Sequence, residues 1–175
     1  MMSIYIGCDL GGTNIKAGSV DLASGTVLSS RVIPTRSQEG QGEVIQRLSG
    51  LIKDLLEQHP STAETIQGIG VSVPGILDLE AGKIKFLTNF PGKWKDFPLA
   101  DHLGEILDKP VTLLNDVRAI TYGEYIYGAG KGAERMACIA IGTGVEGRLI
   151  IDQKLVLGFQ GTAGELGHQI VEPHG

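Results

Sequence analysis

Hydrophobic positions along this chain alternate with polar ones in short runs that glycine-rich turns separate. The first three runs, residues 4–10, 15–21 and 26–33, have the length and bounding turn residues of β-strands. Turns at residues 11–14 and at Ser24-Gly25 connect them. The chain is therefore expected to open as strand-turn-strand-turn-strand, with no helix directly after the first turn.

A helical spacing of apolar residues then begins. Residues 42–58 carry a stripe at intervals of three and four, and His59-Pro60 ends it because proline lacks a backbone donor. We expect this segment to be a helix with one buried face. The stripe consists of Val44, Ile45, Leu48, Leu51, Ile52, Leu55 and Leu56.

The middle of the chain alternates strands and helices. Residues 66–73 read as a buried strand, and residues 76–97 as a hairpin followed by a long loop. Residues 98–108 form a short amphipathic helix, and residues 111–114 form a brief strand that runs into Asn115-Asp116. A further helix is expected from there to about Tyr127.

The last part repeats the opening pattern. Gly128–Gly132 looks like a loop or domain boundary, after which residues 135–141 and 145–151 form two strands around a Gly142–Gly144 turn. This unit resembles residues 4–21, which predicts two related domains. The predicted domains are residues 1–127 and the incomplete start of a second domain, residues 128–175.

Composition narrows the class of protein. The chain has 175 residues, 42% hydrophobic and 20% charged, which is typical of a globular protein, and 26 glycines favour tight turns and close backbone approach to a ligand. A net charge of −5 without a basic run predicts no nucleic-acid or membrane partner. Without a signal-like start or a long apolar stretch, a cytoplasmic location is expected. Cys8 and Cys138 lie in apolar runs and are predicted core residues.

The first candidate site is the turn in Asp9-Leu-Gly-Gly-Thr-Asn-Ile-Lys16. Two glycines expose consecutive backbone N–H groups to an anion, Thr13 and Asn14 add donors, and Asp9 suits a hydrated Mg²⁺ beside phosphates. An ordinary hairpin turn is the alternative. Neither a Walker A loop nor a dinucleotide fingerprint fits, because both need a helix directly after the glycines.

A second turn, Gly142-Thr143-Gly144, has the same bare backbone and one hydroxyl. By itself this is weak evidence. Because it stands in the hairpin that resembles the first one, we interpret it as a second phosphate-binding turn.

The pair Asn115-Asp116 stands at the end of one strand and the start of a helix. Ligands gather at strand ends in open α/β sheets, so Asp116 is a candidate general base for a sugar hydroxyl. The alternative is that the pair only caps the helix, which both residue types favour.

The fourth candidate is Gly164-Glu165-Leu-Gly-His168. A carboxylate and an imidazole three residues apart share one face if the segment is helical. Such a pair suits vicinal sugar hydroxyls, and a neutral histidine also ligates zinc. A surface turn is the alternative.

The order of these motifs carries more information than any one of them. DLGGTN, LLNDVRA, IGTG and AGELGH, together with SVPGILD at 72–78 and TNFPGKWKDFPL at 88–99, resemble the ROK family of bacterial sugar kinases and sugar-responsive repressors. That family belongs to the actin/hexokinase-like ATPases. The resemblance implies an α/β, ribonuclease-H-like fold in two domains that bind ATP, Mg²⁺ and a sugar, and a homodimer for the complete protein.

The resemblance also assigns residues. It implies that the first turn and the second bind phosphates, with Asp9 near Mg²⁺, and that His168 ligates a structural Zn²⁺ as well as the sugar. The implied phosphate-binding residues are Gly11, Gly12, Thr13, Asn14, Thr143 and Gly144, and the implied sugar-binding residues are Gly75, Thr88, Asn89, Asn115, Asp116, Glu165 and His168.

The implied activity is ATP-dependent phosphorylation of a hexose, with glucose, giving glucose 6-phosphate, as the first candidate. An N-acetylhexosamine such as N-acetylmannosamine, or another hexose, is the alternative substrate. A sugar-sensing regulator of the same family is the alternative class. Such regulators carry a helix-turn-helix before the first strand, and the strand here starts within four residues of Met1.

Three departures from the family pattern matter. No cysteine follows Cys138, whereas the family continues into a Cys-x-Cys-Gly-x-x-Gly-Cys zinc segment, so we expect a fragment or a truncated, inactive remnant. Glu146 and Arg148 stand where glycines are usual, and each costs about 1 kcal/mol or more if its φ must be positive. Arg118 is also unusual and is expected either to point to solvent or to reach the phosphates.

Overall fold

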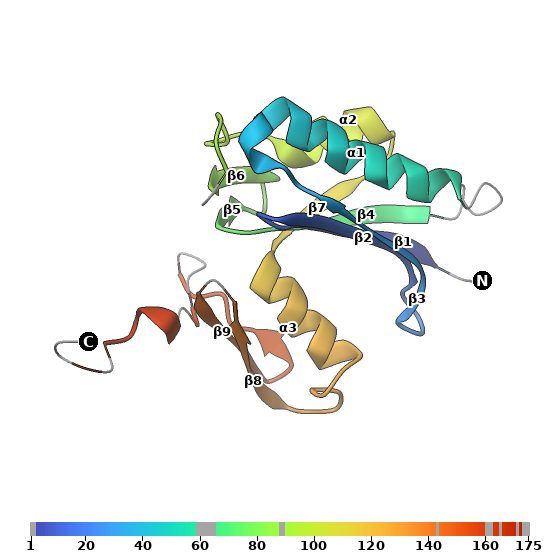
Figure 1. The fold of residues 1–175 in the computed structure, drawn as a ribbon. Coiled ribbons are helices and arrows are strands. Elements are labelled where there is room, and N and C mark those ends of the chain that lie inside the picture. Colours follow the sequence, from blue (N-terminus) through green and yellow to red (C-terminus); the bar gives the residue numbers. More distant parts are fainter. Residues whose placement is uncertain are drawn as a thin grey trace. The chain divides into compact units, whose positions relative to one another are not determined.

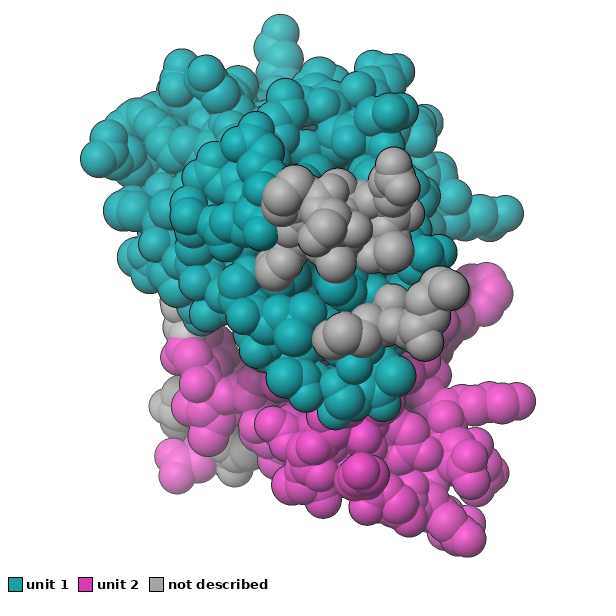
Figure 2. All heavy atoms as spheres, turned by 90° about the vertical axis from the view of Figure 1, so that its right-hand side faces the viewer, with its two compact units in different colours: residues 1–116 teal, residues 117–175 magenta. Residues whose placement is uncertain are grey.

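A computed structural model describes residues 3–58, 66–87, 90–142, 144–159, 163–164, 166–170 and 172. The chain divides into two compact units, residues 1–116 and residues 117–175 (Figure 2). The division falls at the start of helix α3. The domains proposed from the sequence, with a boundary after residue 127, stay a prediction.

The first unit is built on a mixed five-stranded sheet with the order β3-β2-β1-β4-β7. The three strands of the opening meander, β1 (Ile4–Leu10), β2 (Asn14–Asp21) and β3 (Thr26–Pro34), pair antiparallel. On the other side of β1, β4 (Ile66–Val73) and β7 (Val111–Asn115) pair parallel to it. The carboxyl ends of three strands therefore lie at one edge of the sheet.

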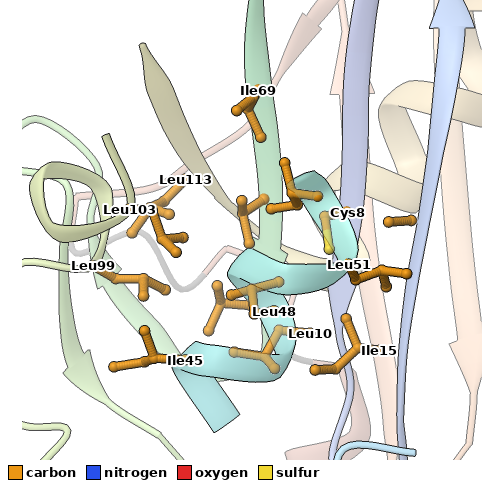
Figure 3. Packing of buried hydrophobic residues seen from close by; sticks show 14 of the residues in the cluster. Cys8, Leu10, Ile15, Ile45, Leu48, Leu51, Ile69, Leu99, Leu103 and Leu113 are labelled. Atoms are coloured by element: carbon orange, nitrogen blue, oxygen red, sulfur yellow. The ribbon is translucent and has the colours of Figure 1, made fainter. Parts of the chain in front are cut away.

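One face of this sheet is covered by α1 (Gln41–Glu57) and α2 (Leu99–Leu107), as Figure 1 shows. Because side chains alternate along a strand, the even-numbered residues of β1 from Ile4 to Leu10 point into this layer and are buried. The predicted helical stripe is confirmed, with Leu48 and Leu51 packed against the strands (Figure 3). The odd-numbered residues of β1, Asp9 among them, lie on the opposite face.

A hairpin and a loop extend the first unit. Strands β5 (Ile76–Asp78) and β6 (Lys83–Phe86) pair antiparallel. Ile84 of β6 is fully buried and its N–H donates to the carbonyl oxygen of Phe97. Around Trp94, edge-to-face ring contacts join Phe90, Phe97 and, through Phe97, His102 of α2. Besides these elements, a short 3₁₀ turn, η1 (Ser37–Glu39), precedes α1.

The second unit contains α3 (Asp116–Ile126) from Val117 onward and a three-stranded antiparallel sheet. Its strands are β8 (Arg135–Ile141), β9 (Val145–Ile151) and β10 (Lys154–Leu155), in the order β10-β9-β8. A 3₁₀ turn, η3 (Leu166–His168), follows. The predicted strand-turn-strand repeat of the opening hairpin is thus confirmed.

Apolar side chains of the second unit are exposed. Ile139 and Ile141 of β8 are 59% and 83% exposed, and Val145 and Ile151 of β9 are 46% and 44% exposed. These side chains form an exposed apolar surface on one face of the sheet.

Candidate functional site

The candidate site of the first unit lies where β1, β4 and β7 end. Asp9 is opposite Ser72 in the β1–β4 register, and Val73 is opposite Asn115 in the β4–β7 register. Parallel pairing thus brings the end of β1, the Pro74-Gly75 turn after β4 and the Asn115-Asp116 pair to the same edge of the sheet. The sequence motifs in this group are separated by tens of residues along the chain but are neighbours across two strand pairings.

The Gly11–Asn14 turn closes the β1–β2 hairpin with a hydrogen bond from the Gly11 N–H to the Asn14 carbonyl oxygen, 3.0 Å long. A Cβ atom on Gly11 would stand 2.8 Å from that same oxygen, so the turn requires glycine there. At Gly12 a Cβ atom would meet nothing within 4 Å. The backbone at Gly12 therefore borders open space, which an anion can enter.

Asp9 is held by a residue that the sequence reading did not select. The Ser72 hydroxyl donates to Asp9 Oδ1 at 2.7 Å. The other carboxylate oxygen, Oδ2, is 4.0 Å from the position of a Cβ atom on Gly11, on the side of the turn. A carboxylate fixed beside this turn has the ligand chemistry that suits a hydrated Mg²⁺. The signal for Ser72 was one hydroxyl near the end of a mostly apolar strand.

Asn115 connects two predicted site residues. Its side-chain N–H₂ group donates to the Gly75 carbonyl oxygen at 3.3 Å and to Asp116 Oδ1 at 3.0 Å. Asn115 is buried at the end of β7, and Asp116 is the first residue of α3. The amide therefore orients the Asp116 carboxylate and fixes the turn at Gly75 through the same nitrogen. The predicted contact of Asn115 with a sugar stays a prediction.

Gly75 has a backbone conformation that glycine favours, with φ of 90°. A Cβ atom there would lie 2.2 Å from the carbonyl oxygen of Phe86, at the end of β6. The turn after β4 is thus packed directly on the hairpin strand. Thr88 and Asn89, the sugar-binding pair expected just after that strand, lie outside the described residues.

In the second unit, the Gly142–Gly144 turn joins β8 to β9. The Gly142 N–H donates to the Gly144 carbonyl oxygen at 2.9 Å, which confirms a tight turn. Thr143 is outside the part of the chain that the structure describes. Phosphate binding by Thr143 and Gly144 stays a prediction.

The expectation of strain at Glu146 and Arg148 is wrong. Both residues lie inside β9, and neither is among the described non-glycine residues with positive φ. Arg148 is 2% exposed; its guanidinium donates to the Gly147 carbonyl oxygen at 2.7 Å and pairs with Glu146 at 3.2 Å. The strand therefore accommodates both side chains, and the charge of Glu146 has a cation beside it.

The segment of the fourth motif packs against β9 by its backbone. The Gly147 N–H donates to the Gly164 carbonyl oxygen at 2.9 Å, and a Cβ atom on Gly167 would be 2.0 Å from the Val145 carbonyl oxygen. These contacts bring the motif next to the second turn within this unit. Glu165 is outside the described residues, and of His168 only the backbone, in η3, is described.

Arg118 is buried, 6% exposed, in the first turn of α3. The expected alternative in which it points to solvent is therefore wrong. Together with Val117 and Thr121, it is one of the buried residues of this helix.

Two further features concern metal ligands and membrane-spanning helices. Within the described ranges, no group of three or more His, Cys, Asp or Glu side chains could hold a metal ion. The zinc site through His168 stays a prediction. In the same part of the chain, no helix combines the length and the apolar character needed to span a bilayer.

Three features define an actin-like ATPase fold: a mixed sheet with this strand order, a glycine hairpin turn beside an aspartate, and a second hairpin of the same kind. Solved ROK sugar kinases share this fold. The model of the ROK family matches residues 5–175. The chain belongs to the ROK family.

Kinases and regulators are both among its relatives. A glucokinase of Halalkalibacterium halodurans is 36% identical over 98% of this chain and 51% of its own length. A xylose repressor of Bacillus subtilis is 31% identical over 97% of this chain and 43% of its own length. The structure of a ROK family glucokinase from Streptomyces griseus, in complex with glucose and AMPPNP, aligns with a TM-score of 0.83 and 33% identity, over 98% of this chain and 52% of that one. The chain thus spans about half the length of these relatives.

Proposed function

We propose that the protein carrying this chain is an ATP-dependent hexose kinase, with glucose as its first candidate substrate and Asp116 as the general base. The observation that carries the proposal is the gathering of Asp9, the Gly11–Asn14 turn and the Asn115-Asp116 pair at one edge of the sheet. Relatives named glucokinase, 36% identical, support the same activity.

Phosphoryl transfer needs positioning and charge neutralisation more than covalent chemistry from the protein. In the proposed mechanism, the Asp116 carboxylate orients a sugar hydroxyl and accepts its proton as the oxygen attacks the γ-phosphate. The bond from Asn115 to Asp116 Oδ1 keeps that carboxylate in one orientation. Gly75 supports the arrangement through its carbonyl oxygen, which accepts from the same amide.

Phosphates are proposed to bind at the Gly11–Asn14 turn, where the backbone borders open space. Asp9 would hold a hydrated Mg²⁺, which supplies charge neutralisation to the phosphate oxygens. In the second unit, Thr143 and Gly144 are proposed as further phosphate ligands and Glu165 and His168 as sugar ligands.

The test is sugar-dependent ADP production by protein purified from its complete reading frame, wild type against Asp116→Asn. General-base catalysis contributes about 10²–10⁴-fold, so the variant should lose activity by roughly that factor while its glucose affinity stays similar. Asp101→Asn, an exposed aspartate in the first turn of α2, is the matched control. Unchanged turnover in Asp116→Asn would remove the base from the mechanism.

The sugar is identified by a panel. Glucose, mannose, N-acetylglucosamine and N-acetylmannosamine assayed with ATP distinguish a hexose kinase from an N-acetylhexosamine kinase, because an unpaired polar group in the pocket costs a large factor in kcat/KM. We expect glucose to give the highest kcat/KM. A higher value for an acetamido sugar would replace glucose as the substrate.

A second candidate is a sugar-responsive regulator, which the 31% identity to a xylose repressor favours. A regulator would bind a sugar without producing ADP. Sugar affinity by calorimetry, with no ADP formed in the same sample, is the result that favours this class over the kinase.

A further inference from the structure

Thr35, just after β3, touches the phosphate-binding turn twice. Its hydroxyl donates to the Gly11 carbonyl oxygen at 2.6 Å, and its backbone N–H donates to the Thr13 carbonyl oxygen at 2.9 Å. Thr35 is completely buried. A buried polar side chain in a folded protein normally has its hydrogen bonds satisfied. Both donors of Thr35, the hydroxyl and the backbone N–H, bind carbonyl oxygens of this one turn.

These two hydrogen bonds determine the direction in which the backbone N–H groups of the turn point. In a planar trans peptide, the N–H of a residue points opposite to the carbonyl of the residue before it, and no cis bond occurs among the described residues. With the carbonyls of Gly11 and Thr13 directed to Thr35, the N–H groups of Gly12 and Asn14 point away from it. Two backbone donors on one side of a turn form the kind of concavity that binds anions.

Arg47 of α1 contacts the backbone of Thr35. Its guanidinium donates to the Thr35 carbonyl oxygen at 3.4 Å and forms an ion pair with Glu39, with Glu43 4.0 Å away. Since two carboxylates neutralise this cation, it serves as an anchor for the turn and leaves anion binding to the backbone donors.

From this geometry we infer that Thr35 is a positioning residue for nucleotide binding, which it controls by aiming the N–H groups of Gly12 and Asn14. The inference rests on the proposed function, because it assumes that the turn binds phosphates. Its distinguishing consequence is selective: loss of the Thr35 hydroxyl weakens phosphate binding and leaves the sugar side, built on Gly75 and Asn115, unchanged.

The test compares Thr35→Val, which removes only the hydroxyl at nearly constant volume, with Thr35→Ser, which keeps it. Thr121→Val is the control, because Thr121 is equally buried and its hydroxyl donates to the carbonyl oxygen of Val117 within the same helix. Calorimetry measures the Kd for ADP without Mg²⁺, so that Asp9 takes no part, and the Kd for glucose. One lost hydrogen bond predicts an ADP Kd about 2- to 13-fold higher in Thr35→Val and wild-type values in the other two variants.

Amide hydrogen exchange on the wild-type protein is a second measurement that needs no variant. ADP should slow exchange at Gly12 and Asn14 and change it little at Gly11, whose N–H is already bonded to Asn14. If Thr35→Val does not fold, Thr35→Ala replaces it in the same titrations, and the exchange pattern still tests whether the N–H groups of Gly12 and Asn14 face the phosphates.

The outcomes separate the two proposals. A wild-type protein that binds neither ADP nor pyrophosphate overturns the proposed function and the inference with it. Wild-type ADP binding with no effect of Thr35→Val, or an equal loss of ADP and glucose affinity in that variant, overturns the inference alone. ADP binding without effect on exchange at Gly12 and Asn14 overturns both the proposed phosphate site at this turn and the inference.

Discussion

Gly75→Ala tests whether the turn after β4 is as closely packed as its geometry implies. A Cβ atom there would lie 2.2 Å from the Phe86 carbonyl oxygen and 3.3 Å from the Leu87 Cα atom. Ordinary contacts between such atoms are about 3.5 Å, so the turn and the β6 strand would have to separate by roughly 1 Å. The residue also has a φ of 90°, which an alanine adopts only with strain.

The expected cost has two parts. A positive φ costs a non-glycine residue about 1–2 kcal/mol, and forcing extra volume into a packed place costs about 1–3 kcal/mol. We therefore expect Gly75→Ala to lower the free energy of unfolding by about 2–5 kcal/mol. Because Asn115 donates to the Gly75 carbonyl oxygen, the displaced turn should also weaken sugar binding.

Urea denaturation followed by tryptophan fluorescence measures this change, since Trp94 lies in the core of the same unit. Gly70→Ala is the control: it lies in β4, the strand that leads into this turn, and a Cβ atom there meets nothing within 4 Å. Alanine in place of a glycine in a strand interior should be neutral or stabilise by about 0.5–1 kcal/mol. Gly75→Ala with a stability within 0.5 kcal/mol or so of Gly70→Ala would refute the packing argument.

Two further predictions concern Ser72 of β4 and Cys8 of β1. Ser72→Ala should raise the Mg²⁺ concentration that gives half-maximal activity about 3- to 10-fold, because Asp9 loses the hydrogen bond that orients it, with an unchanged Kd for glucose; an unchanged Mg²⁺ requirement would contradict this. Burial raises the pKa of the Cys8 thiol from 9.0 to about 12, with a smaller contribution from the Asp9 charge. The stability that Cys8 contributes as a neutral thiol is therefore complete below pH 9.0 and is lost as the pH rises toward 12. At pH 8, iodoacetamide should modify the half-buried Cys138 before the buried Cys8, which a mass-spectrometric time course measures.

Much of the fold could be predicted because it is local. The strands of the opening meander and helix α1 follow from the spacing of apolar residues, and their predicted ends agree with the structure to within about one residue. The same holds for β8 and β9, which matches the prediction of a second hairpin. A hydrophobic period fixes the type of an element and the face that it buries.

The supporting residues could not be found in this way. Ser72 is 63 positions from Asp9, and Thr35 is 24 positions from Gly11, so both contacts depend on strand register and chain path. The prediction of strain at Glu146 was wrong for a related reason. A glycine-rich family pattern was taken to mean a turn conformation, whereas these positions lie in an extended strand that any residue adopts.

The hydrogen bond from Asn115 gives the Asp116→Asn experiment its meaning. An asparagine at position 116 can still present its carbonyl oxygen to the Asn115 amide, so the side chain keeps the orientation that the structure shows while losing the ability to accept a proton. A kinase then loses turnover with its sugar affinity largely retained, whereas a sugar-responsive regulator, which needs no base, loses nothing. Since glucokinases and repressors are both among the relatives of this chain, the experiment asks whether turnover of the complete protein depends on proton acceptance at the Asp116 carboxylate.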